Sequence, residues 1–138
     1  MTRRVALLLT MMAIMLVLSS GVALAAYFVG TRGNDDLRGT NNGDEMYGLR
    51  GNDDIRSLGG DDYIEGGTGR DDLRGGNGGD EIYGGRGEDD IFGNDGNDFI
   101  NSADNDIPDV VDCGDGGGDR AVVDIEDTVS NCETENDV

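Results

Sequence analysis

An apolar residue returns every ninth position between Gly30 and Asn101, and glycine and polar residues fill most of the positions between. The recurring residues are Leu37, Met46, Ile55, Ile64, Leu73, Ile82, Ile91 and Ile100. Because side chains alternate between the two faces of a strand, a short strand centred on each of these residues would turn that residue inward. The pattern therefore predicts eight short strands whose core receives one side chain from each strand.

The stretch divides into eight nine-residue units without insertion or deletion, which is the signature of a coil rather than of a globular core. The units are GTRGNDDLR, GTNNGDEMY, GLRGNDDIR, SLGGDDYIE, GGTGRDDLR, GGNGGDEIY, GGRGEDDIF and GNDGNDFIN. Places one to four are rich in glycine, which predicts a tight turn before each strand. Two units then complete one revolution, strands two units apart pair in parallel, and two sheets of four strands result.

An aspartate occupies the sixth place of every unit, and the predicted coil sorts these residues into two columns. The columns are Asp35, Asp53, Asp71 and Asp89 on one edge, and Asp44, Asp62, Asp80 and Asp98 on the other. Stacked loops lie about 4.8 Å apart. Carboxylates at that spacing repel each other and have raised pKa values unless a cation lies between them.

A single aspartate beside glycine would be interpreted most simply as a turn residue. Eight copies in register favour a metal site instead. Calcium suits such a site because it accepts six to eight oxygen ligands in flexible geometry, including backbone carbonyls. The sequence contains no His, which disfavours zinc, copper and iron.

Composition limits the classes of function. The 138 residues include 25 Gly, one Pro and three Phe, and 30 acidic residues face ten basic ones, for a net charge of -20. Such a chain has little apolar bulk for a core and is expected to be disordered unless cations supply counter-charge. The acidic field excludes nucleic acid as a partner. Without His, a nucleophile paired with a base, or a segment that could form a pocket, we expect no enzyme.

The repeat resembles the haemolysin-type (RTX) calcium-binding nonapeptide of secreted bacterial proteins, G-G-x-G-x-D-x-U-x, in which U is apolar. The units that begin at Gly66, Gly75 and Gly84 match it fully, whereas the loop from Ser57 to Asp62 departs most. The resemblance implies a parallel β-roll, that is, a two-sheet right-handed β-solenoid that folds on binding calcium. The ligands would be the sixth-place aspartates and loop carbonyls, with about six ions in the gaps between stacked loops.

The N-terminal 25 residues have the order of a signal peptide. Arg3 and Arg4 precede an apolar run from Val5 to Leu18, and Ala23-Leu24-Ala25 forms a small-residue cleavage signal. An uncleaved anchor is the alternative, because Val5 to Ala26 is just long enough to span a bilayer. Either interpretation places the repeats outside the cytoplasm, as a secreted or surface-associated protein.

Residues 102–138 are expected to cap the roll of residues 26–101. Residues 109–112 look like a strand, and residues 113–123 look like one more turn and strand, in which Asp119 is a ninth candidate ligand. An exported product is oxidised, so Cys113 and Cys132 are expected to form a disulfide. A stapled end would protect the open strand edges.

The outward positions differ between alternate units. In one set an acidic column runs beside an arginine column, which can fix strand register. In the other, aromatic residues alternate with carboxylates, and Tyr47, Tyr63, Tyr83 and Phe99 are candidates for contact with a glycan or a cell-surface partner. Cross-strand packing is the simpler interpretation of these aromatic residues. The leading functional prediction is calcium binding, and adhesion or glycan binding is the alternative.

Overall fold

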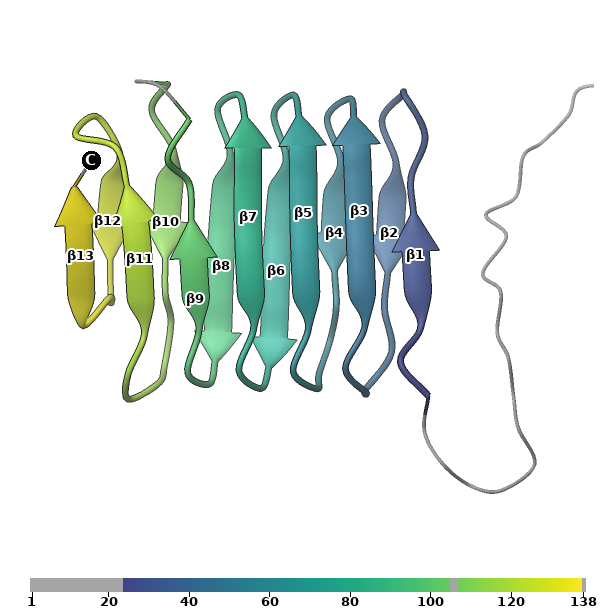
Figure 1. Ribbon diagram of the computed structural model, residues 1–138, viewed down its shortest axis with the longest axis horizontal. Helices are drawn as coiled ribbons and strands as arrows, with labels where there is room; N and C mark the ends of the chain where they lie inside the picture. The colour runs from purple at the N-terminus through teal and green to yellow at the C-terminus, as the bar shows by residue number, and fades with distance from the viewer. Residues whose placement is uncertain (1–23, 105–106, 138) are drawn as a thin grey trace, which may run out of the picture.

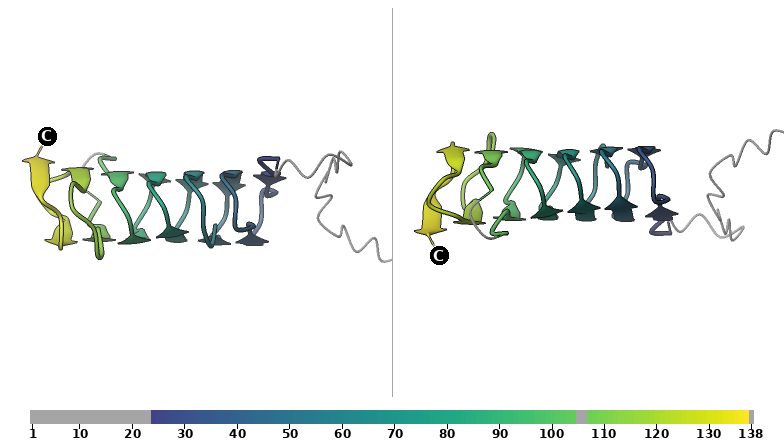
Figure 2. Two further views of the ribbon diagram at one scale, coloured as in Figure 1. Left: turned by 90° about the horizontal axis from the view of Figure 1, so that it is seen from below. Right: turned by 90° about the horizontal axis from the view of Figure 1, so that it is seen from above.

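The computed structural model describes residues 24–104 and 107–137, which form a flattened coil of short strands (Figure 1). One sheet contains, in spatial order, β1 (Tyr27–Val29), β3 (Glu45–Arg50), β5 (Tyr63–Thr68), β7 (Glu81–Arg86), β9 (Phe99–Asn101), β11 (Arg120–Val123) and β13 (Thr134–Asp137). The other contains β2 (Asp36–Arg38), β4 (Asp54–Arg56), β6 (Asp72–Asn77), β8 (Asp90–Asp95), β10 (Val110–Asp112) and β12 (Thr128–Ser130). Figure 2 shows the two sheets as parallel layers along the axis of the coil. The fold is the predicted all-β solenoid of two parallel sheets.

The strand register follows the period of the repeat. Leu37 pairs with Ile55, and Ile55 pairs with Leu73, so that partners within the repeats lie two units apart, as predicted. The eight units of the repeat form four strands in each sheet, as predicted, and the sheets as a whole have seven and six strands. The additional strands are β1, which precedes the first complete unit, and β10 to β13, which continue both sheets through the C-terminal region.

The core is a single row of inward side chains between the layers. All eight predicted core residues are completely buried, and Phe28, Val111, Ala121 and Val123 extend the row at its two ends. Each strand therefore contributes little apolar surface to the core.

The turns use positive backbone φ at the second and fourth places of each stacked unit. Gly67 has φ 109° and Gly69 has φ 134°, and a Cβ on Gly69 would overlap the carbonyl oxygen of Gly51 in the adjacent loop. At the second place Leu49 and Leu58 adopt φ values of 77° and 84°, at a steric cost that glycine does not have. In the described chain, positive φ begins with Leu49, after the first two loops, which do not stack on an earlier loop of the repeat.

The C-terminal region continues the coil as a cap. Strand β10 pairs with β8 and β11 pairs with β9, but at offsets longer than two units of the repeat, since Val110 pairs with Asp90 and Arg120 with Phe99. Cys113 and Cys132 form the predicted disulfide, with a Cα–Cα distance of 5.1 Å. Since Cys113 is buried in the core, the bridge ties the last revolution of the coil to its interior.

The predicted signal peptide of residues 1–25, and the alternative anchor that begins at Val5, lie almost entirely outside the described residues. Within residues 24–104 and 107–137, no helix is long and apolar enough to cross a membrane.

Candidate metal-binding loops

The sixth-place aspartates form two ladders along opposite edges of the coil, where the connecting loops lie in Figure 1. In each ladder one carboxylate oxygen, Oδ1, accepts the backbone N–H of the aspartate one revolution earlier. On one edge the N–H groups of Asp35, Asp53 and Asp71 donate to Asp53, Asp71 and Asp89 at 2.9, 2.8 and 2.8 Å. On the other, those of Asp44, Asp62, Asp80 and Asp98 donate to Asp62, Asp80, Asp98 and Asp119 at 2.7, 2.9, 2.8 and 2.8 Å. The structure therefore brings all nine predicted ligands into two columns.

The second carboxylate oxygen, Oδ2, is buried in most of these loops without a hydrogen-bond donor. Such oxygens belong to Asp53, Asp62, Asp71, Asp80, Asp89 and Asp98. Each of these residues is at most 3% exposed. Burying a charged acceptor without a partner is strongly unfavourable, so the unpaired oxygens call for a ligand that supplies positive charge.

A second acceptor, a carbonyl oxygen of the next loop in the column, lies close to most of these unpaired oxygens. At Gly66, a Cβ would lie 2.7 Å from Asp71 Oδ2 and 2.6 Å from the carbonyl oxygen of Gly84. Gly48 and Gly75 lie in the same way between an aspartate Oδ2 and the first-place carbonyl of the next loop, and Gly93 lies between Asp98 Oδ2 and the Cys113 carbonyl. The first-place glycines are also left out of the strand pairing, since Tyr47 pairs with Glu65 and Leu49 with Gly67, and the residues between them do not pair. Glycine at the first place therefore lets two oxygen acceptors from neighbouring loops face each other.

Burial without counter-charge raises the pKa of these carboxyl groups. The pKa rises to about 8 for Asp89, about 7 for Asp80, and about 6 for Asp53 and Asp98, chiefly through desolvation. The backbone N–H that each Oδ1 accepts offsets part of this effect, and neighbouring aspartates add to it. The loops therefore favour either protons or cations at neutral pH.

The first loop of each column is different. Thr31 donates its backbone N–H and its hydroxyl to Asp35 Oδ2, at 2.6 and 3.0 Å. Thr40 does the same for Asp44 Oδ2, at the same distances. These two predicted ligands lie in the columns, but the chain already supplies donors to the oxygens that are unpaired elsewhere.

Sequence reasoning missed Asp109, which continues the column of Asp89. Its Oδ1 accepts the Asp89 N–H at 2.7 Å, its Oδ2 is unpaired, and the residue is 1% exposed. Desolvation raises its pKa to about 7. The sequence pattern assigns Asp109 to a strand, because the register of the repeat breaks before it. An aspartate followed two residues later by an apolar residue, as in Asp109-Val110-Val111, matches places six and eight of the repeat and was the available signal.

Among the described residues, no group of three or more His, Cys, Asp or Glu side chains could by itself hold a metal ion. A cation in these loops would therefore be held by carboxylates together with backbone carbonyls. This donor set consists entirely of oxygen, which suits calcium.

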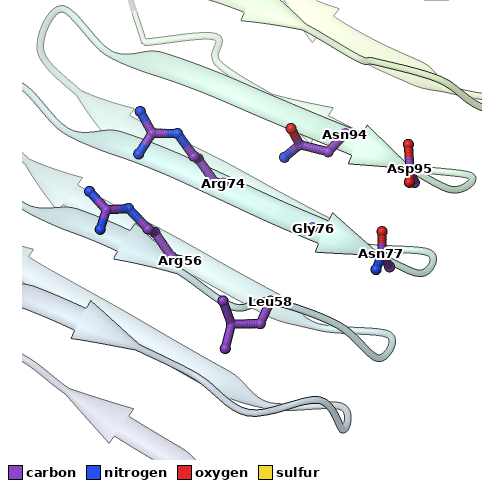
Figure 3. A pocket seen from close by; sticks show the side chains of 7 residues that line it. All are labelled: Arg56, Leu58, Arg74, Gly76, Asn77, Asn94 and Asp95. Atoms are coloured by element: carbon purple, nitrogen blue, oxygen red, sulfur yellow. The ribbon is translucent and has the colours of Figure 1, made fainter.

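The outer face of the six-stranded sheet carries the predicted acidic and arginine columns. Arg74 pairs with Asp72 at 2.7 Å and with Asp54 at 3.6 Å, and Arg56 also pairs with Asp54. Beside these arginines the face is hollowed into a groove of about 380 Å³, shown in Figure 3 and lined further by Leu58, Gly76, Asn77, Asn94 and Asp95. Because both guanidinium groups are paired with carboxylates, the groove has mixed charge.

The outer face of the seven-stranded sheet carries a continuous row of aromatic rings. Its members are Tyr27, Tyr47, Tyr63, Tyr83 and Phe99, with successive ring centroids 5.4, 5.6, 5.5 and 6.1 Å apart. The Tyr83 hydroxyl donates to Glu81 at 2.5 Å, which together with desolvation raises the Tyr83 pKa to about 12. This arrangement favours cross-strand packing, and a glycan or cell-surface partner for these rings stays a prediction.

Comparison with protein-family models matches residues 29–64 and 65–100 to the RTX calcium-binding nonapeptide repeat. Because the matches cover more than half of the chain, the protein belongs to this family of calcium-binding repeat proteins. No curated protein and no solved structure matches the chain.

Proposed function

We propose that this protein is an extracellular calcium-binding protein whose β-roll folds when calcium enters the stacked loops. The observation that carries the proposal is the series of buried Oδ2 atoms that face carbonyl oxygens of the next loop without a donor between them. Calcium supplies the positive charge that this arrangement lacks, and it tolerates a mixture of carboxylate and carbonyl ligands.

The chain holds the ligand oxygens in position but does not supply the positive charge that would balance them. Oδ1 of each carboxylate is fixed by a backbone N–H, so Oδ2 is held toward the adjacent loop. First-place glycines such as Gly66 leave that oxygen open to the next carbonyl. The residues that would hold calcium are the sixth-place aspartates, with about six ions in total.

Coupling between calcium and folding follows from the composition. A chain with a net charge of -20 and one core side chain per strand gains little from collapse and suffers strong self-repulsion. The sites exist only when the loops are stacked, so the free energy of calcium binding becomes free energy of folding. We expect dissociation constants of roughly 0.1 to 1 mM, as in other extracellular calcium modules.

The test compares two charge-matched substitutions. Asp71→Asn changes a buried ladder residue with an unpaired Oδ2, whereas Asp36→Asn changes an exposed residue on the outer face of β2. Calcium titration by calorimetry, with magnesium in parallel, should show weaker binding or one site fewer for Asp71→Asn, and wild-type binding for Asp36→Asn. Equal calcium binding by the two variants would contradict the proposal.

Attachment to a glycan or a cell surface through Tyr47, Tyr63, Tyr83 and Phe99 has no specific observation in its favour, because these rings pack on one another. The expected absence of catalysis and of nucleic-acid binding also stays a prediction.

A further inference from the structure

Ser57 stands at a place where every other unit of the repeat has glycine. The residue is completely buried. In the Gly66 loop the corresponding position lies between Asp71 Oδ2 and the Gly84 carbonyl oxygen. In the Ser57 loop the equivalent oxygens belong to Asp62 and Gly75, so a side chain occupies the space that glycine leaves open elsewhere.

The hydroxyl of Ser57 places a hydrogen between these two acceptors. It donates to the carbonyl oxygen of Gly75, while Asp62 Oδ2 is buried without a donor. A hydroxyl has one hydrogen, so it serves one of the two oxygens at a time. The Gly75 carbonyl, which would be a calcium ligand by analogy with Gly84, is thus already hydrogen-bonded.

In every other respect Asp62 belongs to its ladder. Its Oδ1 accepts the Asp44 N–H at 2.7 Å, its own N–H donates to Asp80 at 2.9 Å, and it is 3% exposed. What distinguishes this loop from the Asp80 and Asp71 loops is therefore the side chain at its first place.

In the first loop of each column the donors bond the aspartate itself. Thr31 and Thr40 supply hydroxyl and N–H donors to Asp35 and Asp44. Three loops thus carry a donor at the candidate site, to the aspartate in two of them and to the facing Gly75 carbonyl in the third, and all three lie in the N-terminal half of the repeat. From Gly66 onward, every unit of the repeat begins with glycine, and the second place is glycine or Asn94.

We propose that Ser57 closes the calcium site of the Asp62 loop, because its side chain lies where calcium would bind and its hydroxyl is bonded to the Gly75 carbonyl. The inference rests on the proposed calcium binding and specifies which loops use it. Two effects act together: the Ser57 side chain occupies space beside Asp62, and its hydrogen occupies the Gly75 oxygen. Calcium then binds in the loops that begin with glycine and supply no donor of their own to the aspartate.

The test counts bound ions by native mass spectrometry at saturating calcium, using the full chain. Ser57→Gly restores the repeat pattern and should bind one ion more than the wild type. Ser57→Ala keeps the Cβ but removes the donor, so it should bind the wild-type number of ions and be less stable without calcium. An unchanged or lower count for Ser57→Gly would overturn the inference, and a lower count would identify the hydroxyl as a calcium ligand.

The reciprocal substitution is Gly66→Ser, which should close the Asp71 site and remove one ion. Its control is Gly117→Ser in the cap, where a Cβ meets no atom within 4 Å and the count should stay unchanged. Circular dichroism of the calcium-loaded variants verifies the fold, and if Gly66→Ser fails to fold, the count for Ser57→Gly decides alone. Calcium binding by the wild type with no gain in Ser57→Gly refutes this inference alone, whereas a wild type that binds no calcium refutes the proposed function as well.

Discussion

Asp71 and Asp53 are joined by a hydrogen bond that engages only one of the two carboxylate oxygens of Asp71. The Asp53 N–H donates to Asp71 Oδ1 at 2.8 Å, while Asp71 Oδ2 is buried without a donor. The same bond that fixes one loop on the next therefore leaves an acceptor inside the stack. Repeated along both edges, this relationship makes the roll dependent on whatever neutralises those oxygens.

Protons are the alternative to calcium, which predicts an unusual pH dependence. The pKa values of Asp89 and Asp80 are raised in the folded chain to about 8 and about 7, from an ordinary value of 3.8. A raised folded pKa stabilises the fold fully below about pH 4, and the contribution is lost as pH rises through the folded values, about 6 to 8. In chelator, the strand signal in circular dichroism should therefore decrease between pH 4 and pH 8.

With calcium present the trend should reverse, because calcium binds the deprotonated carboxylates and its apparent affinity rises with pH. A strand signal in chelator that increases with pH would contradict this assignment of the buried carboxyl groups.

Gly69 and Gly33 occupy the same place of the repeat and should respond differently to alanine. Gly69 has φ 134° and a Cβ there would overlap the Gly51 carbonyl, whereas at Gly33 the nearest atom to a Cβ is Thr31 Oγ1 at 3.8 Å. We expect Gly69→Ala to lower the free energy of unfolding by about 2 kcal/mol or more, from backbone strain and overlap. Gly33→Ala should stay within about 0.5 kcal/mol.

Urea unfolding in saturating calcium measures both glycine variants on the same scale. Similar midpoints for Gly69→Ala and Gly33→Ala would show that close stacking of the loops is not what requires glycine at this place.

The Cys113–Cys132 bridge should stabilise the cap. Closing a loop of this size contributes about 3 kcal/mol by the loop-entropy model. The double variant Cys113→Ala, Cys132→Ala should lose a similar amount of unfolding free energy in calcium, measured by urea denaturation. Treatment of the wild type with dithiothreitol is the matching control, and an unchanged midpoint in both would show that the cap holds without the bridge.

Much of the fold was predictable because the coil and the sequence share one period. With one turn and one strand in each unit, Leu37 and Ile55 had to stack, and Asp53 had to lie over Asp35. The cap was harder, because β10 and β11 pair with β8 and β9 at offsets longer than two units, which hid Asp109 from a search at fixed spacing.

The sequence pattern also did not predict which loops supply a donor to their own aspartate. A threonine at the second place donates to its aspartate in the first loops, whereas Leu49 and Leu58 adopt positive φ at that place. The backbone conformation that decides this depends on whether the loop stacks on an earlier one, which is a tertiary property.

The most direct test of the account is circular dichroism of the purified protein at pH 7.5, first in chelator and then titrated with calcium, with magnesium in parallel. The account predicts little strand signal in chelator and a cooperative rise with calcium but not with magnesium, because magnesium keeps its waters and demands octahedral geometry. A complete strand signal in chelator at this pH would contradict calcium-driven folding.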